Sequence, residues 1–271
     1  MRADSYFASR YGSRTRAKDI LKRGLVLRAG KPLSPSDEVH EGDCFQFLSD
    51  KDGYVSRGGY KLERGLDTFG ETVAGDVFAD LGASTGGFTE VLLERGAARV
   101  YAVDVGEAQL APVLAEDPRV RVMDHTNARY LTADSFPESL DGIVSDLSFI
   151  SLRLVLPAVA GLLGAGKRAF VLFKPQFECG GTGLGKGGIL PVKYHRALLS
   201  DFYDFCLTLS LAPRAIVNAP IAPRKNIEYV VFLQKNASPL GRDDFLNAAK
   251  FSVENDGRIQ KSTCIYTAFI V

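Results

Sequence analysis

The sequence predicts an α/β fold: a mostly parallel, seven-stranded sheet with helices on both faces, preceded by a small α+β module. Two observations predict it. From about residue 57 onward, short apolar runs of strand length alternate with longer segments of helical periodicity. Before that point the chain is basic and its elements are shorter. We therefore expect residues 1–47 to form one domain, 48–56 a polar linker and 57–271 a larger domain.

The N-terminal module is predicted to hold a helix and two short strands. Ser13 can cap a helix that contains Ala17, Ile20 and Leu21 and ends at Gly24. The two strands are predicted at 25–27 and 44–47, and a turn is predicted at 29–32, after the first strand.

The larger domain is predicted from its alternating pattern. Strand-length apolar runs occur at 76–81, 99–104, 119–123, 141–147, 168–174, near 213–218 and at 227–234. Helices are predicted at 59–69, 87–95, 107–115, 151–163 and 193–210. Ligands of such sheets bind outside the carboxyl ends of the parallel strands, so polar residues that follow a strand are the candidates for function.

Composition is that of an ordinary globular protein, with 46% hydrophobic and 24% charged residues. The four cysteines are widely separated and form no C-x-x-C pair, so neither a zinc site nor a disulfide framework is predicted. Their thiols are expected to be reduced, which is typical of a cytoplasmic protein. The long apolar stretch 154–173 contains Pro157, three glycines and two basic residues, which argues against membrane insertion. The sequence does not predict an oligomeric state.

Positive charge is concentrated near the N-terminus. Residues 1–31 hold nine Lys and Arg against two Asp, although the net charge of the chain is only +1. Such a cluster favours contact with a polyanion, and a solvated helix surface is the simpler alternative. The candidate RNA-binding residues are Arg2, Arg10, Arg14, Arg16, Lys18 and Lys22, with Arg57 at the entry to the larger domain.

A glycine loop between a predicted strand and helix, 80–89, indicates a nucleoside-containing cofactor. Its spacing, Gly82-x-x-x-Gly86 with Asp80 ahead, differs from the G-x-G-x-x-G of dinucleotide sites. An acidic residue there repels a pyrophosphate but can pair with the amine of S-adenosylmethionine. An ordinary α/β turn is the alternative. The candidate cofactor-binding residues are Asp80, Gly82, Ala83, Ser84, Thr85, Gly86, Gly87, Phe88, Asp104, Val105 and Asp124.

Four charged residues are the candidates for catalysis. Asp146 and Lys174 end predicted strands, Glu228 lies in an otherwise apolar strand, and Lys61 is at the entry to the larger domain. Two lysines and two carboxylates beside the cofactor suit methyl transfer to a hydroxyl, because an alcohol is a poor nucleophile that must lose its proton or be aligned. Asp146 is not followed by the Pro-Pro-aromatic sequence of many base-amine methyltransferases, which disfavours base methylation.

Several motifs together resemble the TlyA (haemolysin A) family, and the larger domain also resembles the wider FtsJ-like ribose 2′-O-methyltransferases. The motifs are Ser56-Arg57-Gly58-Gly59-Tyr60-Lys61-Leu62, Asp80 to Thr89, Thr126-Asn127-Ala128-Arg129, Ser148-Phe149-Ile150-Ser151-Leu152, Lys174-Pro175-Gln176-Phe177-Glu178 and Gly185-Lys186-Gly187-Gly188. The resemblance covers nearly the whole chain.

The resemblance implies a Rossmann-like fold that uses S-adenosylmethionine, an N-terminal S4-like RNA-binding module, and a Lys-Asp-Lys-Glu tetrad at Lys61, Asp146, Lys174 and Glu228. It implies that the substrate is a cytidine ribose in ribosomal RNA, within ribosomal subunits. Arg57, Arg64, Arg129 and Lys186 extend the expected RNA surface. After Gly188 the family often continues Val-Arg-Asp, whereas here Ile189-Leu190-Pro191-Val192 follows, so contacts made by that Arg or Asp are absent.

Three other functions fit the sequence less well. A membrane-active haemolysin is disfavoured because no span or long basic amphipathic helix is predicted. A non-catalytic RNA-binding assembly factor is disfavoured because the tetrad and the glycine loop are both present. A small-molecule O-methyltransferase is disfavoured because the basic N-terminal module would then have no role.

Overall fold

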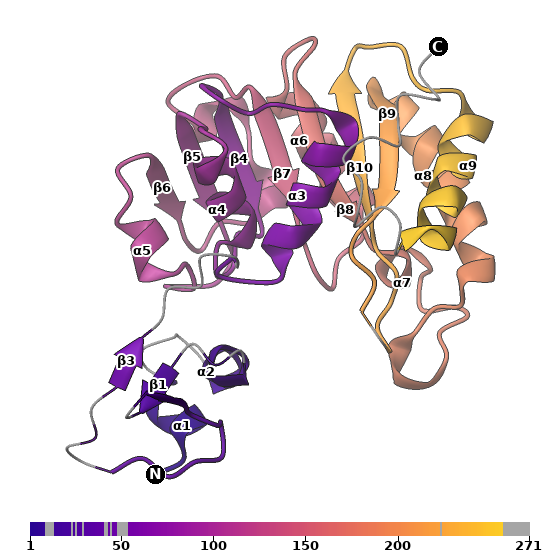
Figure 1. The fold of residues 1–271 in the computed structure, drawn as a ribbon. Helices are drawn as coiled ribbons and strands as arrows, with labels where there is room; N and C mark the ends of the chain where they lie inside the picture. Colours follow the sequence, from indigo (N-terminus) through magenta and orange to yellow (C-terminus); the bar gives the residue numbers. More distant parts are fainter. Residues whose placement is uncertain are drawn as a thin grey trace. The chain divides into compact units, whose positions relative to one another are not determined.

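The computed structural model describes residues 1–8, 14–22, 24, 26–28, 30–40, 43, 45–47, 54–222 and 224–256. The chain forms two compact units, Met1–Tyr54 and Val55–Val271 (Figure 1). Most of the expected linker, 48–56, lies outside the described residues.

Over its described residues, the first unit combines two helices with a three-stranded antiparallel sheet. The helices are α1 (Ala3–Tyr6) and α2 (Arg14–Lys22), and the strand order is β2 (Lys31–Pro32), β1 (Val26–Arg28), β3 (Phe45–Phe47). The predicted helix is present as α2: its Ala17 and Leu21 are buried in one apolar cluster with Val26 of β1, and its Ile20 packs against this cluster. Its expected cap, Ser13, lies outside the described residues.

The side of α2 next to its apolar side is basic. Arg14, Lys18 and Lys22 recur every four residues, so they share one side of the helix, and all three are exposed. Arg14 also lies 3.2 Å from the buried carboxylate of Asp4, which a second arginine, Arg2, contacts at 3.1 Å. The hydrogen bond from Arg2, together with the Arg14 guanidinium, lowers the pKa of Asp4 to about 2 against the opposing effect of desolvation.

These two arginines therefore have a structural partner, yet their side chains stay 50% and 59% exposed and available to a phosphate. Arg10 and the side chain of Arg16 lie outside the described residues.

The second unit is built on a seven-stranded sheet in the order β6-β5-β4-β7-β8-β10-β9 over the described residues. Only β10 runs against its neighbours, so the sheet is mostly parallel, as predicted. The strands are β4 (Val77–Leu81), β5 (Arg99–Val103), β6 (Val120–Met123), β7 (Gly142–Ser145), β8 (Arg168–Phe173), β9 (Leu211–Asn218) and β10 (Tyr229–Lys235).

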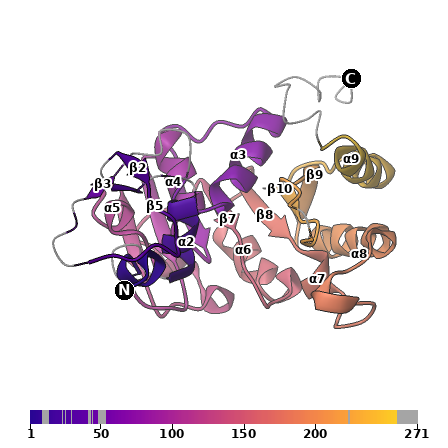
Figure 2. The ribbon, with the colours of Figure 1, turned by 60° about the horizontal axis from the view of Figure 1, so that its bottom comes forward.

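Helices cover both faces of this sheet, and Figure 2 shows α3 and α6 on opposite sides of it. Alternation along β8 explains this arrangement, because Val171 packs in one buried cluster with α6 and α8, while Phe170 stacks on Phe69 of α3. The helices are α3 (Gly58–Phe69), α4 (Gly87–Glu94), α5 (Pro112–Ala115), α6 (Leu156–Leu162), α7 (Pro175–Glu178), α8 (His195–Thr208) and α9 (Arg242–Glu254).

Two predicted helices are shorter than expected. The one predicted at 107–115 is limited to α5, because the backbone before Pro112 is instead bound by carboxylates: Asp104 accepts from Gly106 N and Asp124 from Ala108 N. The one predicted at 151–163 divides into a 3₁₀ turn, Leu152–Leu154, and α6, whose first turn holds Pro157, a residue that favours helix starts. Helix α9 was not predicted. Within the described residues, no helix is both long and apolar enough to cross a membrane.

Candidate active site

The loop between β4 and α4 has a conformation that requires glycine. Gly86 has φ +98°, and a Cβ there would lie 2.3 Å from Leu114 Cδ1. Gly87 begins α4 against the first turn of α3, and its Cβ would lie 2.9 Å from Gly59 N. The glycines thus let the backbone turn and let two helix N-termini approach closely.

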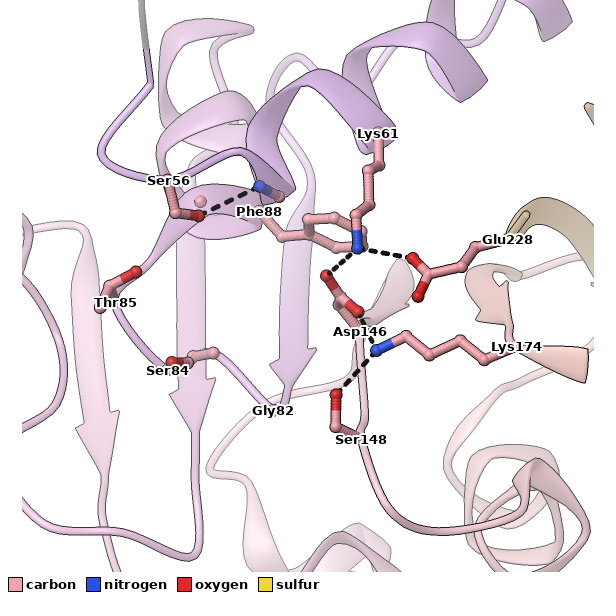
Figure 3. Close-up of a pocket in the computed structure, with 13 residues that line it drawn as sticks. Ser56, Lys61, Gly82, Ser84, Thr85, Phe88, Asp146, Ser148, Lys174 and Glu228 are labelled. Carbon is pink, nitrogen blue, oxygen red and sulfur yellow. Dashed lines mark hydrogen bonds and ion pairs between the residues drawn. The ribbon is translucent and has the colours of Figure 1, made fainter. Parts of the chain in front are cut away.

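This loop forms one wall of a cavity of about 340 Å³ (Figure 3). The cavity is lined by Ser56, Gly58, Lys61, Gly82, Ala83, Ser84, Thr85, Gly87, Phe88, Asp146, Ser148, Lys174 and Glu228. Six predicted cofactor residues and all four predicted catalytic residues are therefore brought together at the carboxyl edge of the parallel strands.

Five predicted cofactor residues do not line the cavity: Asp80, Gly86, Asp104, Val105 and Asp124. Asp104 accepts hydrogen bonds from Ser84 N and Gly106 N, both at 2.8 Å, and so supports the glycine loop. Asp124 accepts from Ala108 N at 2.9 Å. Val105 is 66% exposed on the loop that follows β5.

Asp80 is a buried carboxylate behind the glycine loop. Its Oδ2 accepts from the Thr89 hydroxyl at 2.7 Å, while its Oδ1 has no hydrogen-bond partner among the described residues. Desolvation, with smaller contributions from the charges of Asp146 and Asp104, raises the pKa of Asp80 to about 7. An unpaired buried acceptor of this kind is costly unless a donor or cation comes to it.

The raised pKa of Asp80 predicts a pH-dependent stability. The folded-state pKa, about 7, lies above the ordinary aspartate value of 3.8, so the folded protein binds the proton more tightly than the unfolded chain. The free energy of unfolding from this residue therefore falls as pH rises, by roughly 2–3 kcal/mol between pH 5 and pH 8. Asp80→Asn, which cannot ionise, is expected to lack this decrease when calorimetric unfolding of the ligand-free protein is compared at the two pH values. Equal decreases in both proteins would contradict the assignment.

The four predicted catalytic residues form a chain of alternating charge (Figure 3). Lys61 Nζ, from α3, lies 2.7 Å from Glu228 Oε2 and 3.2 Å from Asp146 Oδ2. Asp146, just after β7, places its Oδ1 2.6 Å from Lys174 Nζ, just after β8. Glu228 directly precedes β10, which pairs with β8, so three strand ends and one helix converge here.

This alternation stabilises the charged forms of the central residues. Burial acts to lower the pKa of Lys61, but the charges of Asp146 and Glu228 outweigh it and the pKa is raised. Burial acts to raise the pKa of Asp146, but Lys61 and Lys174 outweigh it and the pKa is lowered. Asp146 is therefore a carboxylate between two ammonium groups.

The sequence did not single out Ser56 and Gly58, which line the cavity, nor four residues that follow Asp146 or Lys174. Ser148 accepts a hydrogen bond from Lys174 Nζ at 2.9 Å, and Gln176 donates to Glu228 Oε1 at 3.4 Å. Phe149 is 91% exposed, and its ring lies 5.3 Å from that of Phe177. All four lie within motifs that follow Asp146 or Lys174, and this proximity in sequence was the available signal.

The expected RNA surface of this unit is only partly present. Arg57, Arg129 and Lys186 are exposed. Arg64 is instead 9% exposed and forms an ion pair with Asp256, so its assignment to an RNA surface was wrong. It lies one turn after Lys61 on α3, a position that faces the interior of the unit.

Residues 54–235 match the FtsJ-like methyltransferase family. The chain is 40% identical over 234 residues to the 16S/23S rRNA (cytidine-2′-O)-methyltransferase TlyA of Mycobacterium tuberculosis, covering 82% of this chain and 84% of that protein. It is 39% identical over 194 residues to Hemolysin A of Brachyspira hyodysenteriae, covering 70% and 80%. A solved structure from Streptococcus thermophilus, also given a hemolysin name, is 34% identical with a TM-score of 0.75, covering 97% of this chain and 98% of that one.

Proposed function

Since this chain belongs to the FtsJ-like methyltransferases, and within them to the TlyA proteins, we propose that it methylates a ribose 2′-hydroxyl of ribosomal RNA, at a cytidine, with S-adenosylmethionine as methyl donor. The observation that carries the proposal is a series of ion pairs on the wall of the cavity beside the glycine loop. It links Glu228 to Lys61, Lys61 to Asp146 and Asp146 to Lys174. We place the activity in the cytoplasm, in contact with ribosomal subunits.

The residues around the glycine loop fit this cofactor. The loop itself carries no Lys or Arg, and Asp80 and Asp104 set negative charge behind it, which suits an amine, a sulfonium and ribose hydroxyls and opposes a pyrophosphate. Asp80 Oδ1 is a buried acceptor that an α-ammonium group would satisfy. We assign the ribose of the cofactor to Asp104 and the adenine to Val105 and Asp124.

Lys174 is the residue that we assign to the ribose hydroxyl. An ammonium group has three N–H donors. Lys174 donates one to Ser148 and forms an ion pair with Asp146, so a donor remains for the hydroxyl oxygen. This hydrogen bond aligns the oxygen for in-line attack, and positioning of this kind lowers the barrier substantially. Lys61 and Glu228 hold Asp146 in place and balance its charge.

Bound S-adenosylmethionine supplies an electrophilic methyl group on a cationic sulfur. As the new oxygen–carbon bond forms, the hydroxyl becomes strongly acidic, so its proton passes to Asp146 even though two ammonium groups make this carboxylate a weak base. Transfer of the methyl group to this oxygen would break the sulfur–carbon bond of the bound cofactor and leave its electron pair on sulfur. The products are the 2′-O-methylated nucleotide, S-adenosylhomocysteine and a proton.

Phe149 and Phe177 provide a surface for the base of the target nucleotide. The ring of Phe149 is 91% exposed, and Lys174 Nζ lies 5.8 Å from the Phe177 ring, so the aromatic pair adjoins the group that contacts the ribose. Proteins commonly recognise single-stranded RNA by stacking its bases on aromatic side chains. The exposed basic face of α2, Arg14 with Lys18 and Lys22, supplies phosphate contacts elsewhere on the RNA.

Incubation with radiolabelled S-adenosylmethionine and separate, unmodified ribosomal subunits tests this function. We expect label in the ribosomal RNA of at least one subunit, and none in DNA of the same sequence, which lacks the 2′-hydroxyl. Cofactor binding without label in either subunit would overturn the proposed substrate.

A further inference from the structure

Two segments at the edge of the cavity run side by side. The first, Asp146–Leu152, follows β7, and the second, Lys174–Glu178, follows β8 and includes α7. At their first residues they are joined by polar contacts, because the Lys174 ammonium lies 2.6 Å from Asp146 Oδ1 and 2.9 Å from Ser148 Oγ (Figure 3).

Two further contacts join the same segments. The rings of Phe149 and Phe177 lie 5.3 Å apart with an interplanar angle of 44°. Beyond them, Glu178 Oε2 accepts from the Ser151 hydroxyl at 2.5 Å, and its Oε1 accepts from Leu152 N at 2.7 Å. The aromatic pair, of which Phe149 is exposed and Phe177 is half-buried, therefore lies between polar contacts on each side.

We infer that Glu178 is a positioning residue for the RNA substrate, acting by fixing the loop that presents Phe149 and Ser148. Glu178 does not line the cavity and touches none of the reacting groups, so its action is indirect. The inference rests on the function proposed above, in which Phe149 stacks on the target base and Lys174 contacts the ribose.

The backbone of Phe149 makes such an anchor necessary. Its φ is +62°, a conformation that non-glycine residues rarely adopt and that persists only where the surroundings enforce it. With 91% of its side chain exposed, Phe149 has little packing of its own to supply that constraint. The carboxylate of Glu178 accepts hydrogen bonds from Ser151 and Leu152, two and three residues beyond Phe149, and so holds the loop close to its exposed tip. Burial raises the pKa of this carboxyl despite these hydrogen bonds.

A fluorescence measurement tests whether Glu178 fixes the loop, without requiring methyl transfer. The chain has no tryptophan, so Phe149→Trp introduces a single reporter at the tip of the loop. Adding Glu178→Ala is expected to lower the anisotropy of this tryptophan and increase its quenching by acrylamide. Glu178→Gln, which can accept from Leu152 N and donate to Ser151, is expected to restore both. Identical values in all three proteins would refute the inference whatever the enzyme methylates.

Kinetics provide the second readout. Glu178→Ala is expected to lower kcat/KM for RNA about tenfold while the Kd for S-adenosylmethionine changes less than about twofold, and Glu178→Gln is expected to remain near wild type. In a double-mutant cycle, Glu178→Ala should cost much less when Phe149→Ala is already present, because both act through one loop. Losses that multiply would refute the inference, whereas an inactive wild type would refute the proposed function instead.

Discussion

Replacing Lys174 by alanine is expected to reduce methyl transfer to ribosomal RNA by about a thousandfold or more, since it removes the group assigned to the attacking hydroxyl. The Kd for S-adenosylmethionine is expected to change little, because the glycine loop and the carboxylates behind it remain. Single-turnover methylation and calorimetric titration of the cofactor measure the two effects separately.

Lys167 offers a matched control at the opposite end of the same strand. It directly precedes β8, as Lys174 directly follows it, and its ammonium lies 2.5 Å from Asp141. Lys167→Ala therefore removes a paired lysine from β8 without touching the cavity, and full activity is expected. If Lys174→Ala lost cofactor binding and activity together, or if both lysine variants lost activity equally, Lys174 would have no specific role in the transfer step.

Replacing Gly86 by alanine is expected to weaken S-adenosylmethionine binding by at least about tenfold, because a Cβ at this position meets Leu114 and Leu110 and the φ of +98° disfavours any L side chain. The loop must then shift, and Ser84 and Thr85 on the cavity wall shift with it. The affinity is measured by calorimetric titration.

Gly70, just after α3, offers a control that separates backbone strain from the collision of the new Cβ with its neighbours. It also has a positive φ, +66°, but a Cβ there meets nothing within 4 Å. Gly70→Ala therefore reproduces backbone strain without the collision and away from the cavity. We expect it to lower the melting temperature and leave cofactor affinity unchanged; an equal loss of affinity in both variants would mean that general destabilisation, not the loop, is responsible.

The arrangement of the candidate site was predictable where the topology determines it. The carboxyl ends of parallel strands meet at one edge of the sheet, so residues that follow strands, such as Asp146 and Lys174, were expected to lie together. In the structure, Lys174 Nζ lies 2.6 Å from Asp146 Oδ1. Lys61 and Glu228 join them from α3 and from the antiparallel strand β10. Their assigned roles in catalysis remain a proposal.

The differences come from contacts that no local pattern contains. An arginine such as Arg64 is ordinarily expected at the surface. Here it is buried because Asp256, far away in sequence, forms an ion pair with it. Helix α9 begins with polar residues and buries Phe245 and Ala249 against the sheet, a short apolar face that periodicity alone did not reveal. The first part of the helix predicted at 107–115 is replaced by a loop bound to Asp104 and Asp124, since side-chain acceptors there compete with helical hydrogen bonds.

The most direct test of the central claim is the chemical identity of the methylated nucleoside. Ribosomal RNA treated with the wild-type protein and labelled S-adenosylmethionine would be digested to nucleosides and separated by mass spectrometry, with RNA from the Lys174→Ala reaction as control. We expect the label in 2′-O-methylcytidine and none in the control. Label in a base-methylated nucleoside, or equal label from both proteins, would contradict ribose methylation by this site.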